Sequence, residues 1–124
     1  MDNEASFFKT GYSNYGRNLL RLLYESGKYI IAEHASYADP TNPDHIRQAQ
    51  QFPWKIYYNI PKDQEERQNY YSNKNNVFGG FSFEKNCLKF RPDIVFNIRD
   101  RWMCLGETNS IITKSGVKLV KTIK

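Results

Sequence analysis

The chain has 124 residues, of which 40% are hydrophobic and 15% aromatic, enough for one packed domain and too apolar for a generally disordered protein. Its formal charge of +5 does not indicate a nucleic-acid-binding stripe, because residues 1–103 carry 14 basic against 12 acidic side chains and residues 104–124 carry 4 against 1. Two cysteines are too few for a disulfide framework, and no apolar run reaches the roughly 20 residues of a membrane span. We therefore expect a cytoplasmic protein without signal peptide, metal or cofactor.

Residues from Gly11 to Gly27 predict a turn followed by a helix, the clearest helix of the chain. Ser13 or Asn14 can cap its first turn, and Gly27 is placed to end it. The apolar residues that share one face at helical spacing are Tyr15, Leu19, Leu22 and Leu23. This pattern predicts an amphipathic helix.

The short apolar run Tyr29–Ala32 follows the helix and is typical of a buried parallel strand, and Trp54–Tyr58 could form another strand. Between them, the polar composition of residues 37–53 predicts a loop with a short helix over 45–50. The stretch 61–76 is rich in Asn, Gln and charge, and we expect it to be an exposed loop.

Helical spacing returns at Phe83, Cys87 and Phe90, and Pro92 ends that segment before the apolar run 94–98. Cys87, on the apolar face, is expected to belong to the core. Two passages from helix to buried strand predict an α/β fold with a parallel sheet and flanking helices.

After residue 103 the pattern changes to alternating strands. Residues 110–113 and 117–123 flank the turn Lys114-Ser115-Gly116, as in a β-hairpin. Because a hairpin belongs to an antiparallel architecture, we place a domain boundary between residues 1–103 and 104–124.

Two glycines, Gly11 and Gly16, lie with Tyr12 and Arg17 around the predicted start of the first helix. Free N–H groups at a helix N-terminus favour anions such as phosphate or carboxylate. A plain capped loop explains the same residues, and the spacing alone does not decide between these two interpretations.

A second candidate site follows the last predicted strand, where open α/β sheets place their ligands. Asp100 could hold a sugar hydroxyl or act as a base, and Trp102 could stack on a ring. A structural ion pair of Arg99 with Asp100 and a packed Trp102 fit equally well. His34, after the run 29–32, either points into the cleft or is a hydrogen-bonded edge residue.

Cys104 stands at the boundary between the two patterns. An accessible thiolate can attack the preceding carbonyl, here that of Met103, and convert the peptide bond into a thioester. A single cysteine does not by itself establish this reaction.

Residues 11–102 resemble phage and bacterial glycosyltransferases of the two-Rossmann-domain type (GT-B, family 4-like). The resemblance is carried by Thr10-Gly11-Tyr12, Gly16-Arg17, Pro53-Trp54-Lys55, Asn76-Val77-Phe78-Gly79, Arg91-Pro92-Asp93-Ile94-Val95 and Ile98-Arg99-Asp100-Arg101-Trp102-Met103. It implies sugar transfer from a nucleotide sugar, with this part on the acceptor side of the cleft and with Gly11, Tyr12, Gly16, Arg17, His34, Asp100 and Trp102 as substrate-binding candidates.

Such enzymes begin with a β-strand before the glycine turn, where this sequence has only Met1–Phe8. They also bind the donor on a second domain, whose residues cannot be assigned in this sequence. The resemblance therefore implies an incomplete Rossmann-like domain that is inactive until it is completed.

From Cys104 onward the chain resembles the first block of an intein of the Hint fold, in Cys104-Leu105-Gly106-Glu107-Thr108 and the hairpin after it. The resemblance implies that Cys104 is the nucleophile acting on the Met103 carbonyl. The implied partner is a complementary C-terminal intein fragment joined to the rest of the transferase, with nucleotide sugar and acceptor bound after completion.

Three functions stay open at this point. The first is a glycosyltransferase fragment completed by splicing, and the second is a small glycan- or nucleotide-binding protein without catalysis. The third is a basic, aromatic nucleic-acid-binding module, although the charge distribution argues against specific nucleic-acid binding.

Overall fold

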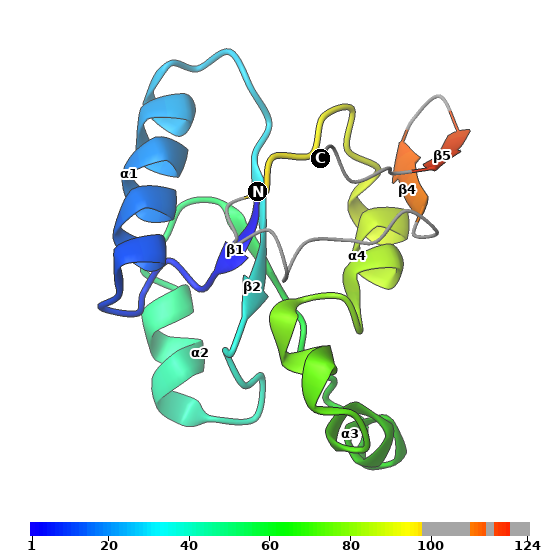
Figure 1. Ribbon diagram of the computed structural model, residues 1–124. Helices are drawn as coiled ribbons and strands as arrows, with labels where there is room; N and C mark the ends of the chain where they lie inside the picture. Colours follow the sequence, from blue (N-terminus) through cyan, green and yellow to red (C-terminus); the bar gives the residue numbers. More distant parts are fainter. Residues whose placement is uncertain (98–109, 114–115, 120–124) are drawn as a thin grey trace.

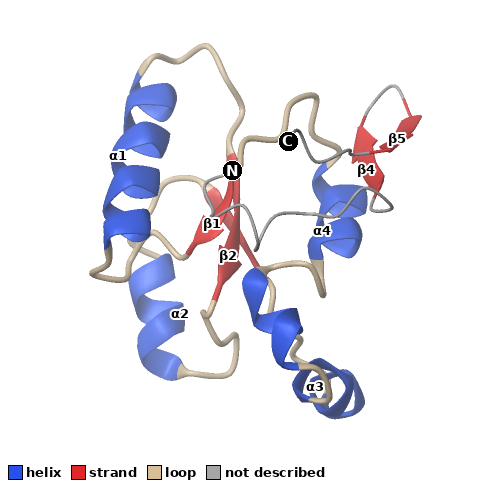
Figure 2. Ribbon diagram, in the orientation of Figure 1, coloured by secondary structure: helices blue, strands red, loops and turns tan. Residues whose placement is uncertain are grey.

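The computed structural model describes residues 1–97, 110–113 and 116–119. The elements in chain order are β1 (Asp2–Glu4), α1 (Gly11–Glu25), β2 (Ala32–Ser36), α2 (Pro43–Ala49), β3 (Lys55–Tyr58), α3 (Gln64–Tyr71), the 3-10 helix η1 (Lys74–Phe78), α4 (Phe83–Phe90), β4 (Ser110–Thr113) and β5 (Gly116–Leu119). Helices flank a small sheet on both sides (Figures 1 and 2). The predicted α/β class is confirmed.

The three strands β1, β2 and β3 are all parallel, with β2 in the middle. Asn3 pairs with Ala35, and Glu33 with Ile56. Asp2 also forms a parallel bridge with Asn97. The chain therefore proceeds from β1 to β3 in one direction and later returns to β1, as in an incomplete Rossmann-like sheet.

The sheet has a core on each face. Ala35 and Ile56 face α1 and α2 in a cluster that also contains Ala5, Leu20, Ala38 and Trp54. On the other face, α4 contributes the small cluster of Phe83 and Cys87, with Val95 packed against it. The prediction that Cys87 lies in the core is confirmed, and burial raises the pKa of its thiol to about 11.

Helix α1 confirms the predicted helix, but its buried face is a different one. The buried residues are Ser13, Gly16 and Leu20, whereas Tyr15 and Leu22 are exposed. Small side chains at positions 13 and 16 let the helix backbone approach β1 closely, so the bulkier apolar residues lie elsewhere. The cap is also one turn earlier than predicted, since Thr10 accepts from the Ser13 N–H (3.1 Å).

Strand β1 lies in the segment where a first strand was not recognised. Its residues Asp2 and Asn3 are polar, and both are buried. Polar, unbranched side chains carry no strand signal in the sequence, so only the pairing with β2 reveals this strand.

Strand β2 begins three residues later than predicted. The apolar Tyr29 and Ile30 precede it, and Ile30 is 89% exposed. The paired residues include Glu33 and His34, whose polar side chains are hydrogen-bonded inside the fold. The prediction of a strand over Trp54–Tyr58 is confirmed by β3.

Residues 61–76 are mostly exposed, as predicted, but they are not an irregular loop, because they contain α3 and the start of η1. Asp63 caps α3, with Glu65 and Glu66 in its first turn, and Tyr70 is its buried residue. One buried position in eight residues leaves almost no apolar periodicity. The predicted helices over 45–50 and 83–90 are confirmed by α2 and α4.

The predicted buried strand over residues 94–98 is also wrong in its described part. Ile94 is 81% exposed. The segment meets β1 at the Asn97 bridge, where the Asp2 N–H donates to the Phe96 carbonyl (2.7 Å) and Asn97 Nδ2 donates to Asp2 Oδ2 (2.6 Å). By contrast, β4 and β5 form the predicted antiparallel hairpin, with Ile112 opposite Val117.

Candidate functional site at the carboxyl edge of the sheet

The carboxyl ends of parallel strands form the usual ligand edge of an open α/β sheet, and ligands gather where the strand order reverses. Here that reversal lies between β1 and the segment that ends at Asn97. The described part of this edge comprises the β1–α1 loop and the loops that follow β2 and β3.

The start of α1 already has an anionic partner within the chain. The Thr10 hydroxyl donates to Glu4 Oε2 (3.0 Å) while its oxygen caps the Ser13 N–H. A carboxylate next to a helix N-terminus is stabilised by the free N–H groups and the helix dipole. Glu4 binds the cap hydroxyl and not the helix N–H groups, and the Thr10 cap itself favours the capped-loop interpretation of this segment.

The two glycines of this segment differ in their surroundings. A Cβ on Gly16 would lie 2.0 Å from Asn3 Nδ2, whereas a Cβ on Gly11 would have nothing within 4 Å. Gly16 is therefore needed for the close contact between α1 and β1 and does not line a ligand site. Gly11 and the half-buried Tyr12 lie in the first turn of α1, beside the edge.

Arg17 is held by its own loop. Its guanidinium donates to the Ser6 carbonyl (2.9 Å), to the Phe8 carbonyl (3.4 Å) and to Asn14 Oδ1. These bonds fix the path of the chain from β1 into α1. A phosphate at this position would compete with the three internal acceptors.

His34 lies in the middle of β2 and is buried beneath α4, away from the carboxyl edge. Its Nε2 is 2.7 Å from the Gly79 carbonyl, which can only accept, so Nε2 carries the proton. Asn86 then donates to Nδ1 (2.9 Å) and also to the Tyr58 carbonyl (3.0 Å). Both ring nitrogens are used, so His34 is hydrogen-bonded as the second alternative predicts, but it lies in the central strand and not at an edge.

A buried carboxylate was not foreseen in the sequence. Glu33 lies in β2 with no exposed surface, and it accepts from the Ser6 N–H (2.7 Å) and from Trp54 Nε1–H (3.0 Å). Burial raises its pKa above the ordinary value, although both hydrogen bonds oppose that shift. Glu33 thus joins β2 to the loop after β1 and to the residue just before β3.

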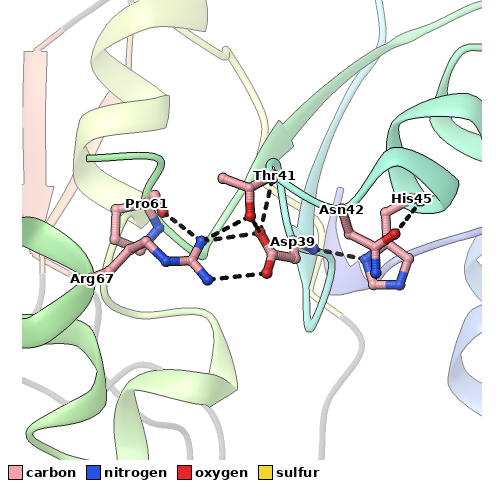
Figure 3. A network of polar contacts seen from close by, with 6 residues as sticks. All are labelled: Asp39, Thr41, Asn42, His45, Pro61 and Arg67. Carbon is pink, nitrogen blue, oxygen red and sulfur yellow. Dashed lines mark hydrogen bonds and ion pairs between the residues drawn. The ribbon is translucent and has the colours of Figure 1, made fainter. Parts of the chain in front are cut away.

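A second polar network joins α3 to the loop after β2 (Figure 3). Arg67 donates from Nη1 to Asp39 Oδ1 (3.0 Å) and from Nη2 to Asp39 Oδ2 (3.1 Å), and Nη1 also reaches the Pro61 carbonyl (3.3 Å). Thr41 donates to Oδ1 through its N–H and its hydroxyl. The Arg67 hydrogen bonds hold the pKa of Asp39 well below its usual range.

The loop that carries Asp39 starts with an unusual backbone conformation. Tyr37, directly after β2, has φ of 66°, in the left-handed region that non-glycine residues rarely adopt. Such conformations persist where surrounding structure holds them, and they gather near functional sites. The sequence offered one signal for this loop, its Asp-Pro-Thr-Asn turn composition.

Four residues of the predicted sites lie outside the described residues: Asp100, Trp102, Met103 and Cys104. Their predicted roles stay predictions. Within the described ranges, no group of three His, Cys, Asp or Glu side chains could hold a metal ion. No helix in those ranges is long and apolar enough to cross a membrane.

No family model, curated protein or solved structure matches the chain. The assignment of function therefore depends on the geometry of the sheet edge and on the sequence motifs.

Proposed function

We propose that residues 1–103 form the acceptor-side part of a glycosyltransferase that uses a nucleotide-sugar donor, and that Cys104 begins an intein that joins this part to the rest of the enzyme. On this proposal the isolated chain is not an active transferase. The protein works in the cytoplasm, where a free thiol such as that of Cys104 stays reduced.

The observation that carries the transferase half is the order of the parallel strands. Because the chain returns to the other side of β1 at Asn97, the strand order reverses between these two segments, and open α/β sheets commonly bind ligands at such a reversal. Asp100 and Trp102 follow that segment in the sequence, so their predicted contacts with a sugar agree with the position of the reversal.

The intein half is supported by the change of architecture after residue 103. The parallel sheet belongs to the first 97 residues, whereas β4 and β5 pair antiparallel with each other. A short antiparallel hairpin soon after a cysteine is what the resemblance to Hint-type inteins implies. The proposed chemistry is attack of Cys104 Sγ on the Met103 carbonyl carbon, with the peptide nitrogen as leaving group.

A transfer assay tests the first half of the proposal. The 124-residue chain and the spliced, completed protein are each incubated with a panel of radiolabelled nucleotide sugars and acceptor glycans. We expect turnover for the completed protein and none for the isolated chain, because one half of a two-domain cleft cannot position donor against acceptor.

Sustained transfer by the purified chain would contradict its interpretation as one half of the enzyme. No transfer by either protein, with saccharide binding intact, would favour the alternative of a small glycan-binding protein without catalysis.

A further inference from the structure

Helix α1 exposes a regular row of residues on the side that faces away from the sheet. This α1 row consists of five exposed residues, Gly11, Tyr15, Asn18, Leu22 and Glu25. Tyr15 is 59% exposed and Leu22 67%. Steps of four and three residues alternate along the row, which is the spacing by which one helix packs along another. In Figure 1 no described element lies beyond this side of α1, so no described helix covers the row.

The α1 row is nearly symmetric about its middle residue, which points to a second copy of the chain as its partner. When two copies of α1 lie antiparallel about Asn18, Tyr15 of each copy meets Leu22 of the other. Asn18 then meets Asn18, and two amides can bond to each other because each both donates and accepts. A twofold interface requires such a pattern, since the same surface must be complementary to itself.

The charges at the two ends of α1 also favour an antiparallel copy. The last turn of α1 has no basic residue and ends in Glu25, next to the negative end of the helix dipole, and the first turn has no acidic residue. In an antiparallel pair each Glu25 lies beside the positive end of the other helix, near the exposed Lys9 that precedes it. Because Glu4 also lies at that end, bonded to Thr10, we expect this contribution to be small.

We propose that α1 is a self-association surface, through which two copies of the chain pair as an antiparallel helix dimer. The half-buried Leu19 widens the apolar contact on one side of the α1 row, and on the other side Arg21 meets Asn14 of the second copy and no like charge. The dimer does not depend on the proposed transferase or intein.

The small size of this contact sets its expected strength. It is limited to one helix of 15 residues from each copy, so it should bury less than the roughly 1,200 Å² of a standard stable interface. We therefore expect a weak dimer, with a Kd of about 100 µM.

Sedimentation equilibrium of the full 124-residue chain measures the association. Over concentrations from about 10 µM to 1 mM, which span the expected Kd, the average mass should rise from that of one chain toward that of two. Leu22→Lys should raise the Kd about tenfold, because it puts a charge into the apolar contact while keeping a good helix former. Leu88→Lys is the matched control. This leucine of α4 is also exposed (49%) but lies outside the α1 row, and its replacement should leave the Kd within about twofold.

Asn18 tests the antiparallel register by a gain as well as a loss. Asn18→Leu should lower the Kd about fivefold, because a polar residue at the centre of a helix seam weakens the pairing. Asn18→Asp should raise the Kd, since two carboxylates then face each other at the axis.

An average mass that stays at that of one chain over the whole concentration range refutes the dimer. If Leu22→Lys and Leu88→Lys change the Kd equally, or if Asn18→Asp leaves it unchanged, the copies associate through another surface and the proposal is wrong.

Discussion

At the scale of single residues, Gly16 is a position where one added carbon atom would disturb the packing of α1 against β1. An added Cβ would lie 2.0 Å from Asn3 Nδ2, and Asn3 is completely buried. We predict that Gly16→Ala lowers the free energy of unfolding by about 1–3 kcal/mol, the usual cost of overpacking, measured by urea denaturation.

Gly11→Ala is the matched control, since nothing lies within 4 Å of its Cβ and alanine is the better helix former. It should leave the stability unchanged or raise it by up to about 1 kcal/mol. In the Asn3→Ala background the cost of Gly16→Ala should largely disappear. If Gly16→Ala lowers the free energy of unfolding equally in both backgrounds, Asn3 is not the residue that the added methyl group meets.

Glu33 provides a prediction about pH. Because burial raises its pKa above 4.5, the folded state keeps this proton at pH values where the unfolded state has lost it. The contribution of Glu33 to stability therefore falls as the pH rises from about 4.5 through the folded pKa. The Glu33→Gln variant lacks this titration. The difference in free energy of unfolding between the wild type and this variant should therefore shrink over that pH range, as measured by urea denaturation at each pH.

Trp54→Phe supplies a second test of the same group. It removes a hydrogen bond that lowers the pKa of Glu33, so the pH-dependent loss should extend to higher pH than in the wild type. A gap between wild type and Glu33→Gln that does not vary with pH would contradict a buried, titrating carboxyl.

At the scale of elements, α3 depends on few contacts. It has one buried residue, Tyr70, and Arg67 connects it to Asp39 in the loop after β2. We predict that Asp39→Asn speeds hydrogen exchange of the α3 amides roughly fivefold relative to those of α1, since a partly exposed, hydrogen-bonded pair contributes about 1 kcal/mol.

The exposed pair of Asp44 and Arg47 in α2 gives the control, because their side chains are 68% and 69% exposed. Asp44→Asn should leave exchange in α3 unchanged. Low pH should have the same effect on the wild type as Asp39→Asn. Arg67 lowers the pKa of Asp39 from 3.8, so the stabilisation of α3 by this ion pair is lost as the pH falls through the folded pKa. Equal exchange in both variants would show that Asp39 does not hold α3.

The existence of most elements could be predicted from the sequence, but their exact positions and buried faces could not. Helix α1 was recognisable from its apolar spacing, yet its buried face consists of Ser13, Gly16 and Leu20. Small residues let the helix backbone lie close to the neighbouring strand, and a search for hydrophobic periodicity does not detect such a face. Strand β1 was not predictable from hydrophobicity either, because its buried side chains are polar. The strand that it pairs with, β2, lies about 30 residues further along the chain.

The candidate site was predictable only in outline. The edge of the sheet follows from a parallel α/β fold, whereas the meeting of Asp39 with Arg67 requires a helix that the sequence pattern did not indicate. His34 was noticed for its chemistry, but only the positions of Gly79 and Asn86 show that both its nitrogens serve the packing of the sheet.

At the scale of the whole molecule, the proposed function divides the chain at one peptide bond, between Met103 and Cys104. The parallel strands β1–β3 lie before it in the sequence, and the antiparallel strands β4 and β5 lie after it. On the proposed function this bond separates the two architectures, and the chemistry that acts there belongs to Cys104.

Mass spectrometry of splicing at Met103–Cys104 tests this claim most directly. The chain is mixed with the complementary C-terminal intein fragment that the proposed function requires, and the products are weighed. We predict that residues 1–103 are released and joined to the new partner, that Cys104→Ala abolishes the product, and that Cys87→Ala retains it, with a stability cost of about 1 kcal/mol at most. Ligation that persists in Cys104→Ala, or an intact Met103–Cys104 bond in the wild-type mixture, would contradict the account.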